Sequence, residues 1–285
     1  MKALVIALVL GSGLAHAIWN SLAKTSENKQ LFLFLISVPF TLVLLPQMIA
    51  ETVMTVSPLQ NYLLLLLSAA IQAGYAHFLS RSLIYGDLSQ VYPMMRGLAT
   101  CMIPLFGILF LNESLTSWGW LGLGLIAAGF FLTSAVSLKI HGWNVQGKVL
   151  FNTIAVGLCT MFYVMVDKVN LQYFSPATLL AVSNIGFMLG LLPSIRFGQI
   201  SLLRELREHG KWFLAGSILS PGSYLLFLFA MNLSPLSYVA PLREIGTVFS
   251  TLIGVFILKE GKGALRLLST GMIFAGILFV GIMGM

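Results

Sequence analysis

The stretch LSQVYPMMRGLATCMIPLFGILFL, residues 88–111, decides how this chain folds. It is long enough to cross a bilayer, which takes about 20 mostly apolar residues, and its one charged residue is Arg96. Of the 285 residues, 58% are hydrophobic and 9% are charged, and the mean hydropathy is +0.94. Roughly a quarter of the residues of a soluble domain are charged, so lipid has to cover most of this surface. We therefore predict an all-α, multi-pass protein of the plasma (inner) membrane.

Ten apolar stretches of this kind follow one another along the chain, separated by short gaps rich in Pro, Gly, Asn or charge. The predicted spans are residues 3–22, 31–50, 59–80, 88–111, 118–137, 148–168, 176–196, 211–232, 235–258 and 264–284.

The first of these spans has an alternative reading as a signal peptide. Lys2 precedes an apolar run that ends in Ala15-His16-Ala17, which resembles a cleavage site. We favour a transmembrane helix, because the apolar run continues through Trp19 and because the segment has a counterpart in the second half of the chain.

The chain repeats itself. The pattern Leu-Ser-x-Val-x-Pro occurs at residues 88–93 and again at 236–241, and the spaced Gly-Leu, aromatic and Lys pattern of residues 13–24 recurs at 157–168. We therefore predict two homologous five-helix repeats, residues 1–138 and 146–285. Because five is odd, the two repeats have opposite orientations, and transporters built this way bind substrate between the repeats. At a spacing of 147, the matched residues are Arg96, Gly107, Glu113, Gly124 and Gly129 with Arg243, Gly254, Glu260, Gly271 and Gly276.

The basic residues predict an orientation. Loops after odd-numbered spans hold twelve Lys and Arg residues, against two on the other side. Loops rich in Lys and Arg stay in the cytoplasm, so both termini are expected outside.

The sequence contains no pattern typical of an enzyme. GxSxG, a P-loop, HExxH and zinc-ligand spacing are all absent, so we expect no catalytic residues, no cofactor and no metal. No basic-aromatic stripe suggests nucleic acid. Cys101 and Cys159 lie far apart in apolar runs and are interpreted as core residues.

Two arginines inside spans are the first candidates for a substrate site, because an ionisable residue in a membrane is costly. Arg96 and Arg243 would both face a central cavity and grip an anionic group. Alternatively they only lock helices together, Arg243 with Glu244 or Asp167, and Arg96 with Asp87. Glu244 is a further candidate, either as a structural partner or as a proton carrier.

Polar and aromatic residues in other spans extend this candidate site. His16, Trp19 and Asn20 share one face of the first predicted helix. Tyr75 interrupts the apolar run of the third span, and Tyr92 could form part of an aromatic wall. The alternatives are hydrogen bonding between helices and an interfacial aromatic belt.

The motifs also carry a family resemblance. The chain resembles the drug/metabolite transporter superfamily, EamA type, in its ten spans, in the Trp and Lys of the first span, and in Leu111-Asn112-Glu113 before a Gly-rich span. Residues 16–20 and 87–97 are similar to a branch associated with phosphonate utilisation. The resemblance implies a metabolite carrier. It also implies cytoplasmic termini, opposite to the charge bias.

We therefore expect a secondary transporter that moves a small polar metabolite, anionic or zwitterionic, by alternating access. One alternative is an importer of a cationic amine held in an aromatic cage, and another is a flippase for a lipid-linked substrate. The expected partners are the substrate and the lipid bilayer, with a proton as one candidate coupling ion, and the chain is expected to be a monomer or a homodimer.

Overall fold

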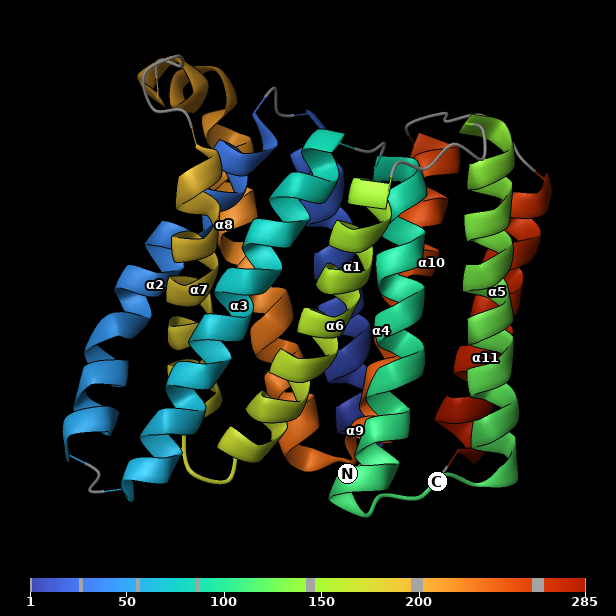
Figure 1. Cartoon of the computed structure of the whole chain (residues 1–285), viewed down its shortest axis with the longest axis horizontal. Coiled ribbons are helices and arrows are strands. Elements are labelled where there is room, and N and C mark those ends of the chain that lie inside the picture. Colours follow the sequence, from blue (N-terminus) through green and yellow to red (C-terminus); the bar gives the residue numbers. More distant parts are fainter. Residues whose placement is uncertain are drawn as a thin grey trace.

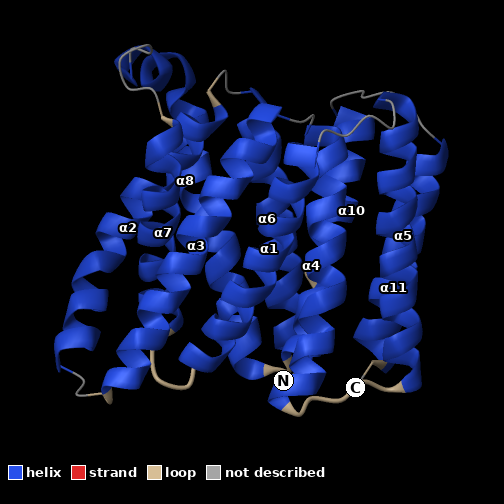
Figure 2. Ribbon diagram, in the orientation of Figure 1, coloured by secondary structure: helices blue, strands red, loops and turns tan. Residues whose placement is uncertain are grey.

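The computed structural model describes residues 2–25, 28–54, 57–85, 88–141, 147–195, 202–257 and 264–284. Within these ranges the regular structure is helical and no strand is present, as Figure 2 shows. The all-α prediction is therefore confirmed. The bounds are α1 Lys2–Thr25, α2 Lys29–Met54, α3 Leu59–Tyr85, α4 Leu88–Leu111, α5 Ser117–His141, α6 Gly147–Asn170, α7 Pro176–Leu191, α8 Leu202–Leu233, α9 Leu236–Leu242, α10 Ile245–Leu252 and α11 Ala264–Met283, with short helices η1 Leu192–Ser194 and η2 Ile253–Ile257.

The helices have the length and composition of membrane spans. In the described part of the chain, nine segments of 19 to 26 residues are apolar enough to cross a bilayer, and Leu267–Met283 is a shorter apolar helix. These agree with the ten predicted spans, except that α8 begins at Leu202, well before the predicted span 211–232. The protein is an integral multi-pass membrane protein. Both ends of the chain lie at the same end of the helix bundle (Figure 1).

Helix packing connects the two halves of the chain. α3 packs on α6 and α7, while α8 packs on α1 and α2. α5 and α11 lie side by side at one edge of the bundle (Figure 1). In the order of the predicted repeats, α8 corresponds to α3, and α1 and α2 to α6 and α7. The third helix of each half therefore packs on the first two helices of the other half, as expected for two related halves. The inverted orientation of the halves stays a prediction.

Glycines allow α5 and α11 to approach backbone to backbone. A Cβ atom built on Gly122 would lie 2.6 Å from the carbonyl oxygen of Gly276, and one on Gly276 would lie 2.5 Å from the oxygen of Gly122. No heavy atom lies within 4 Å of a Cβ built on Gly124 or Gly271. This close contact of small residues forms within one chain, and only some of the glycines are needed for it.

This difference gives a prediction with a matched control. Gly122→Ala is expected to lower the free energy of unfolding by about 1–3 kcal/mol, because the added methyl group forces the two backbones apart. Gly124→Ala, two residues along the same helix, should be neutral or slightly stabilising, since Ala is the better helix former. Melting temperatures of both variants in one detergent test this. Equal melting temperatures would show that the close approach does not matter.

The ninth predicted span, 235–258, agrees with the apolar segment Leu236–Phe256, but its helix is interrupted. Pro241 has no N–H to donate, and the chain leaves the α-helix at Arg243 and Glu244. There the N–H of Glu244 bonds to the carbonyl of Pro241, and that of Gly246 to the carbonyl of Arg243, each three residues back. The break therefore places Arg243 and Glu244 at a turn inside the membrane span, between α9 and α10.

Candidate functional site

A cavity of about 130 Å³ lies in the middle of the bundle. Its walls come from α1, α2, α3, α4, α6, α7, α8 and the turn between α9 and α10. Five of the predicted site residues line it together: His16, Trp19, Tyr75, Arg96 and Arg243. Residues from both halves of the chain thus surround one space.

The cavity is not centred along the membrane normal. Most of its lining residues lie in the middle of a helix or nearer the end that faces away from the chain termini, for example His16 and Trp19 on α1 and Leu33 on α2. Tyr163 on α6 and Tyr224 on α8 lie nearer the termini end of their helices. Figure 1 shows both termini at the opposite end. The cavity therefore lies closer to the end that carries the loops after α1 and α3.

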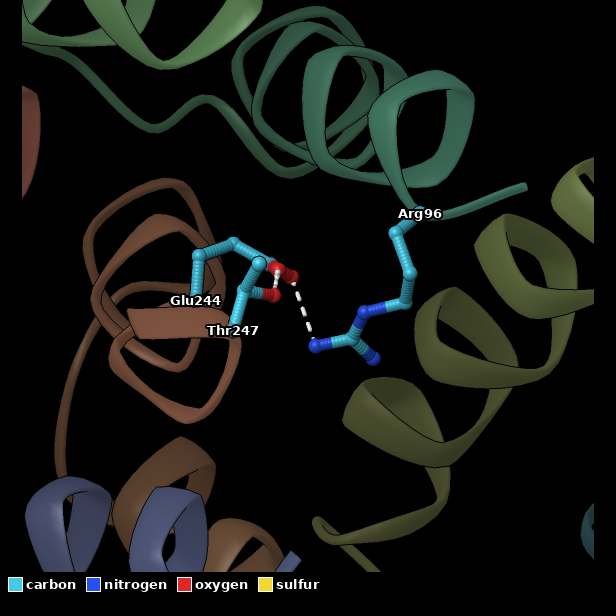
Figure 3. Close-up of polar contacts among 3 residues, drawn as sticks. All are labelled: Arg96, Glu244 and Thr247. Atoms are coloured by element: carbon cyan, nitrogen blue, oxygen red, sulfur yellow. Dashed lines mark hydrogen bonds and ion pairs between the residues drawn. The ribbon is translucent and has the colours of Figure 1, made fainter. Parts of the chain in front are cut away.

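Arg96 and Glu244 form an ion pair across this site. Arg96 Nη2 lies 2.9 Å from Glu244 Oε1, although the N–H is not directed as in a hydrogen bond. Their side chains are 15% and 6% exposed. Thr247 Oγ1 donates a hydrogen bond of 3.0 Å to the other oxygen of Glu244. Figure 3 shows the Arg96 side chain reaching from α4 towards the α9–α10 turn. The pair joins the two halves, whereas Asp87, the partner considered for Arg96, lies outside the described residues.

Arg243 is held differently. Its guanidinium carbon lies 4.2 Å from the ring centre of Phe227 and 5.5 Å from that of Tyr224. The residue is 9% exposed, and its Nε has no hydrogen-bond partner. Among the described residues no carboxylate forms an ion pair with it, so the expected pairing with Glu244 or Asp167 does not occur. Two aromatic faces stabilise this cation by cation–π contact, and Glu244 acts on it electrostatically without forming an ion pair.

Asp167 is a buried carboxylate directly below the cavity. It is 0% exposed and accepts hydrogen bonds from the hydroxyls of Ser68 on α3 and Tyr224 on α8. The Tyr224 ring lines the cavity and contacts Arg243. The centres of the Tyr163 and Tyr224 rings lie 5.9 Å apart. The sequence singles out Asp167 only as an alternative partner for Arg243. It is not among the residues that line the cavity, and its position inside a span is the signal that distinguishes it.

Two of the remaining predicted residues, Asn20 and Glu244, are not among those that line the cavity. Asn20 is partly buried on α1 and is not among the lining residues. Glu244 reaches the site through Arg96. Tyr92 is on α4, but its side chain lies outside the described part of the structure. Small uncharged polar residues were missed, because neither charge nor periodicity distinguishes them within a span. They are Ser37, Thr160, Ser183, Asn184, Ser220 and Ser223.

The end of the bundle nearer the termini is closed by packing. The largest cluster of buried apolar side chains includes several that are no more than 1% exposed, and most of it lies in this half. These side chains separate the cavity from the termini end. They include Leu179, Leu180, Leu228, Met231 and Leu236.

Three charged residues also tie helices together at the termini end. Glu51 on α2 accepts hydrogen bonds from the N–H and hydroxyl of Ser175, which begins α7. The ammonium of Lys168 on α6 donates to the carbonyls of Met231 and Ser234, where α8 ends. Both charges satisfy helix termini that have no intrahelical partner, so they hold remote segments together.

The third tie gives the Asn-Glu motif a structural role. Asn112 has a φ of 53°, a left-handed conformation that Asn tolerates, and it ends α4. Glu113 then accepts hydrogen bonds of 2.7 and 2.6 Å from the N–H groups of Leu236 and Ser237, the first residues of α9. A Cβ on Gly107 would lie 2.8 Å from its carboxylate, so this approach needs glycine. The counterpart Glu260 lies outside the described residues.

Comparison with known proteins agrees with this architecture. Residues 147–282 match the EamA-like transporter family. An uncharacterised transporter in the cobO 3′ region of Sinorhizobium sp. is 44% identical over 52 residues, which cover 18% of this chain and 36% of that relative. A solved crystal structure superposes with a TM-score of 0.70 at 15% identity, covering 98% of this chain and 95% of the other, and supports the fold.

The comparisons bear on the expectations from sequence. The resemblance to EamA-type drug/metabolite transporters is confirmed, and a match to a transporter family supports the expectation that the chain is not an enzyme. The usual location of this family is the inner membrane, as predicted. The phosphonate-associated branch stays a prediction. The family match covers residues 147–282, which is just under half of the chain.

Proposed function

We propose that this protein is a secondary transporter that carries a small anionic or zwitterionic metabolite by alternating access. The observation that carries the proposal is Arg243. It lines the cavity as a cation without an ion-pair partner among the described residues, while Arg96 is neutralised by Glu244. A guanidinium presents a planar fork of N–H donors that fits a carboxylate or phosphonate.

The packing supports alternating access. The cavity is separated from the termini end by buried apolar side chains and by the ties of Glu51, Glu113 and Lys168. Transporters of inverted repeats alternate by rocking one unit against the other around a fixed site. We propose that the two halves of this chain do so and that breaking these ties opens the termini end.

The cavity also has a feature that favours a second candidate. Trp19, Tyr75, Tyr163 and Tyr224 all line it, and aromatic walls can hold a cationic amine. Arg243 borders the same space without an ion-pair partner among the described residues, however, and would repel a cation. We therefore place the anion first and the amine second.

A panel of ligands can distinguish an anionic or zwitterionic substrate from a cationic amine. Purified protein is heated in detergent with methylphosphonate, succinate, L-glutamate or tetramethylammonium, because a ligand that binds the native state raises its apparent stability. At 100 times its Kd, a ligand adds about 2.7 kcal/mol. We expect a higher melting temperature with at least one of the anions. A rise with tetramethylammonium alone, lost in Trp19→Ala, would replace the anion by the amine.

A further inference from the structure

The unusual group in this molecule is Asp167. Its carboxylate is fully buried in α6, and no Lys or Arg of the described residues forms an ion pair with it. Its hydrogen-bond partners are the neutral hydroxyls of Ser68 and Tyr224. A charge buried without an opposite charge is costly. An asparagine could join the same helices if one of the two hydroxyls turned to accept, so hydrogen bonding alone does not require an acid at this place.

The surroundings of Asp167 have opposite effects on the negative charge of its carboxylate. Burial disfavours the carboxylate, whereas two hydroxyl donors stabilise it. The nearest titratable neighbours are Tyr224 of α8 and Tyr163 of α6, both of which interact electrostatically with it. α3 contributes the hydroxyl of Ser68, and α7 places the Ser183 hydroxyl in the surroundings of the acid without a hydrogen bond. Beyond the tyrosines lie two cations, Arg243 next to Tyr224 and Arg96 of α4, which acts on Tyr163.

Asp167 is connected to the proposed anion site. Tyr224 donates its hydroxyl hydrogen bond to Asp167 Oδ2, and the same ring carries the guanidinium of Arg243 at 5.5 Å. One aromatic residue thus contacts both the buried acid and the unpaired cation. An anion at Arg243 and a negatively charged Asp167 would lie on either side of Tyr224. The two negative charges repel each other, so the anion binds more favourably when a proton neutralises Asp167.

We propose that Asp167 is the proton-binding residue that couples transport of the anion to a proton gradient. This rests on the proposed function, since it deepens the same site. When the anion binds at Arg243, Asp167 takes up one proton at a carboxylate oxygen, and Tyr224 and Ser68 reorient their hydroxyls. Anion and proton cross together and leave together, so for a monovalent anion no net charge moves and no bond other than that to the proton changes.

Glu244 is less suited to this role, although it is also buried. It is neutralised by Arg96 at 2.9 Å and accepts a hydrogen bond from Thr247. Protonating it would leave the Arg96 cation without its acid. Protonating Asp167 strands no cation.

The first experiment needs no substrate. Infrared difference spectra of the reconstituted protein are recorded while the pH is varied. We expect a carboxylic-acid band that titrates in the wild type and is lost in Asp167→Asn. Tyr224→Phe should shift the titration midpoint of this band, whereas Tyr173→Phe, an exposed tyrosine, should leave it in place. Absence of a titrating band that depends on Asp167 would overturn the proposal.

The second experiment separates coupling from transport. Proteoliposomes are tested with labelled methylphosphonate, first for exchange at equal pH on both sides and then for accumulation driven by a pH gradient. We expect Asp167→Asn to keep its melting temperature and its exchange but to lose accumulation, and Asp167→Glu to restore part of it.

The other outcomes point to different conclusions. Accumulation that survives in Asp167→Asn, or that follows a sodium gradient, overturns the proposed coupling. Loss of exchange and accumulation together in a folded Asp167→Asn also overturns it, because the residue is then needed for carrying itself. If the wild-type protein exchanges neither methylphosphonate nor the other panel anions, the proposed function fails, and the infrared titration still decides whether Asp167 binds a proton.

Discussion

Replacing Arg243 by glutamine is expected to remove the stabilisation that small anions give to the wild-type protein. Hydrogen bonds to a charged group contribute about 1.5–3 kcal/mol each, so loss of one or two weakens binding by roughly 10-fold to more than 100-fold. The affinity of Arg243→Lys for the anion should lie between those of the wild type and Arg243→Gln, because lysine keeps the charge but not the planar fork or the stacking on Phe227. Melting temperatures over a series of methylphosphonate concentrations measure the apparent Kd of each variant.

The structure also predicts what Arg243→Gln does without ligand. Because no acid of the described residues pairs with Arg243, its removal strands no carboxylate, and we expect only the loss of the cation–π contacts, about 1–2 kcal/mol. Arg81→Gln is the control, since Arg81 is exposed on α3 and should affect neither binding nor stability. If Arg243→Gln binds methylphosphonate as tightly as the wild type while the anion still stabilises both, Arg243 is not the anion site.

The spans could be predicted from sequence because hydropathy is a local property. A stretch such as 88–111 has to lie in lipid whatever surrounds it, and its helix follows from the need to satisfy backbone groups there. The break at residues 243–244 was not predicted. Both Pro93 and Pro241 follow the same Leu-Ser-x-Val-x pattern, yet α4 continues past Pro93 as a helix and α9 ends after Pro241. Proline permits a break, and tertiary contacts decide whether it occurs.

The charged residues of the candidate site could be predicted from the sequence, but which arginine pairs with Glu244 could not. Arg96 and Arg243 stand at matched places in the repeat, which suggested equal roles. The residues after them differ, Gly97 against Glu244, so this part of the repeat supplies one carboxylate for two arginines. That carboxylate pairs with the distant arginine and not with its neighbour in sequence. The asymmetry was visible in the sequence, but which arginine stays unpaired depends on the crossing of α4 with the α9–α10 turn.

The Arg96–Glu244 pair gives the second large effect. Glu244→Gln is expected to lower the free energy of unfolding by about 3–5 kcal/mol, the cost of removing one partner from a buried ion pair. Arg96→Met should have a similar cost, because it leaves the Glu244 carboxylate buried with only Thr247 as a donor. The double variant should lose far less than the sum, because no charge is then left without a partner.

A double-mutant cycle in one detergent measures this coupling. Thr247→Val combined with Arg96→Met serves as the comparison, since Thr247 contacts the same carboxylate but carries no charge, and its hydrogen bond is worth about 1 kcal/mol. If the free-energy changes of Arg96→Met and Glu244→Gln simply add, the contact does not contribute as an ion pair, and Arg96 becomes available as a second anion-binding cation. If they are strongly non-additive, Arg96 acts as a clamp between the two halves, and the anion-binding role falls to Arg243.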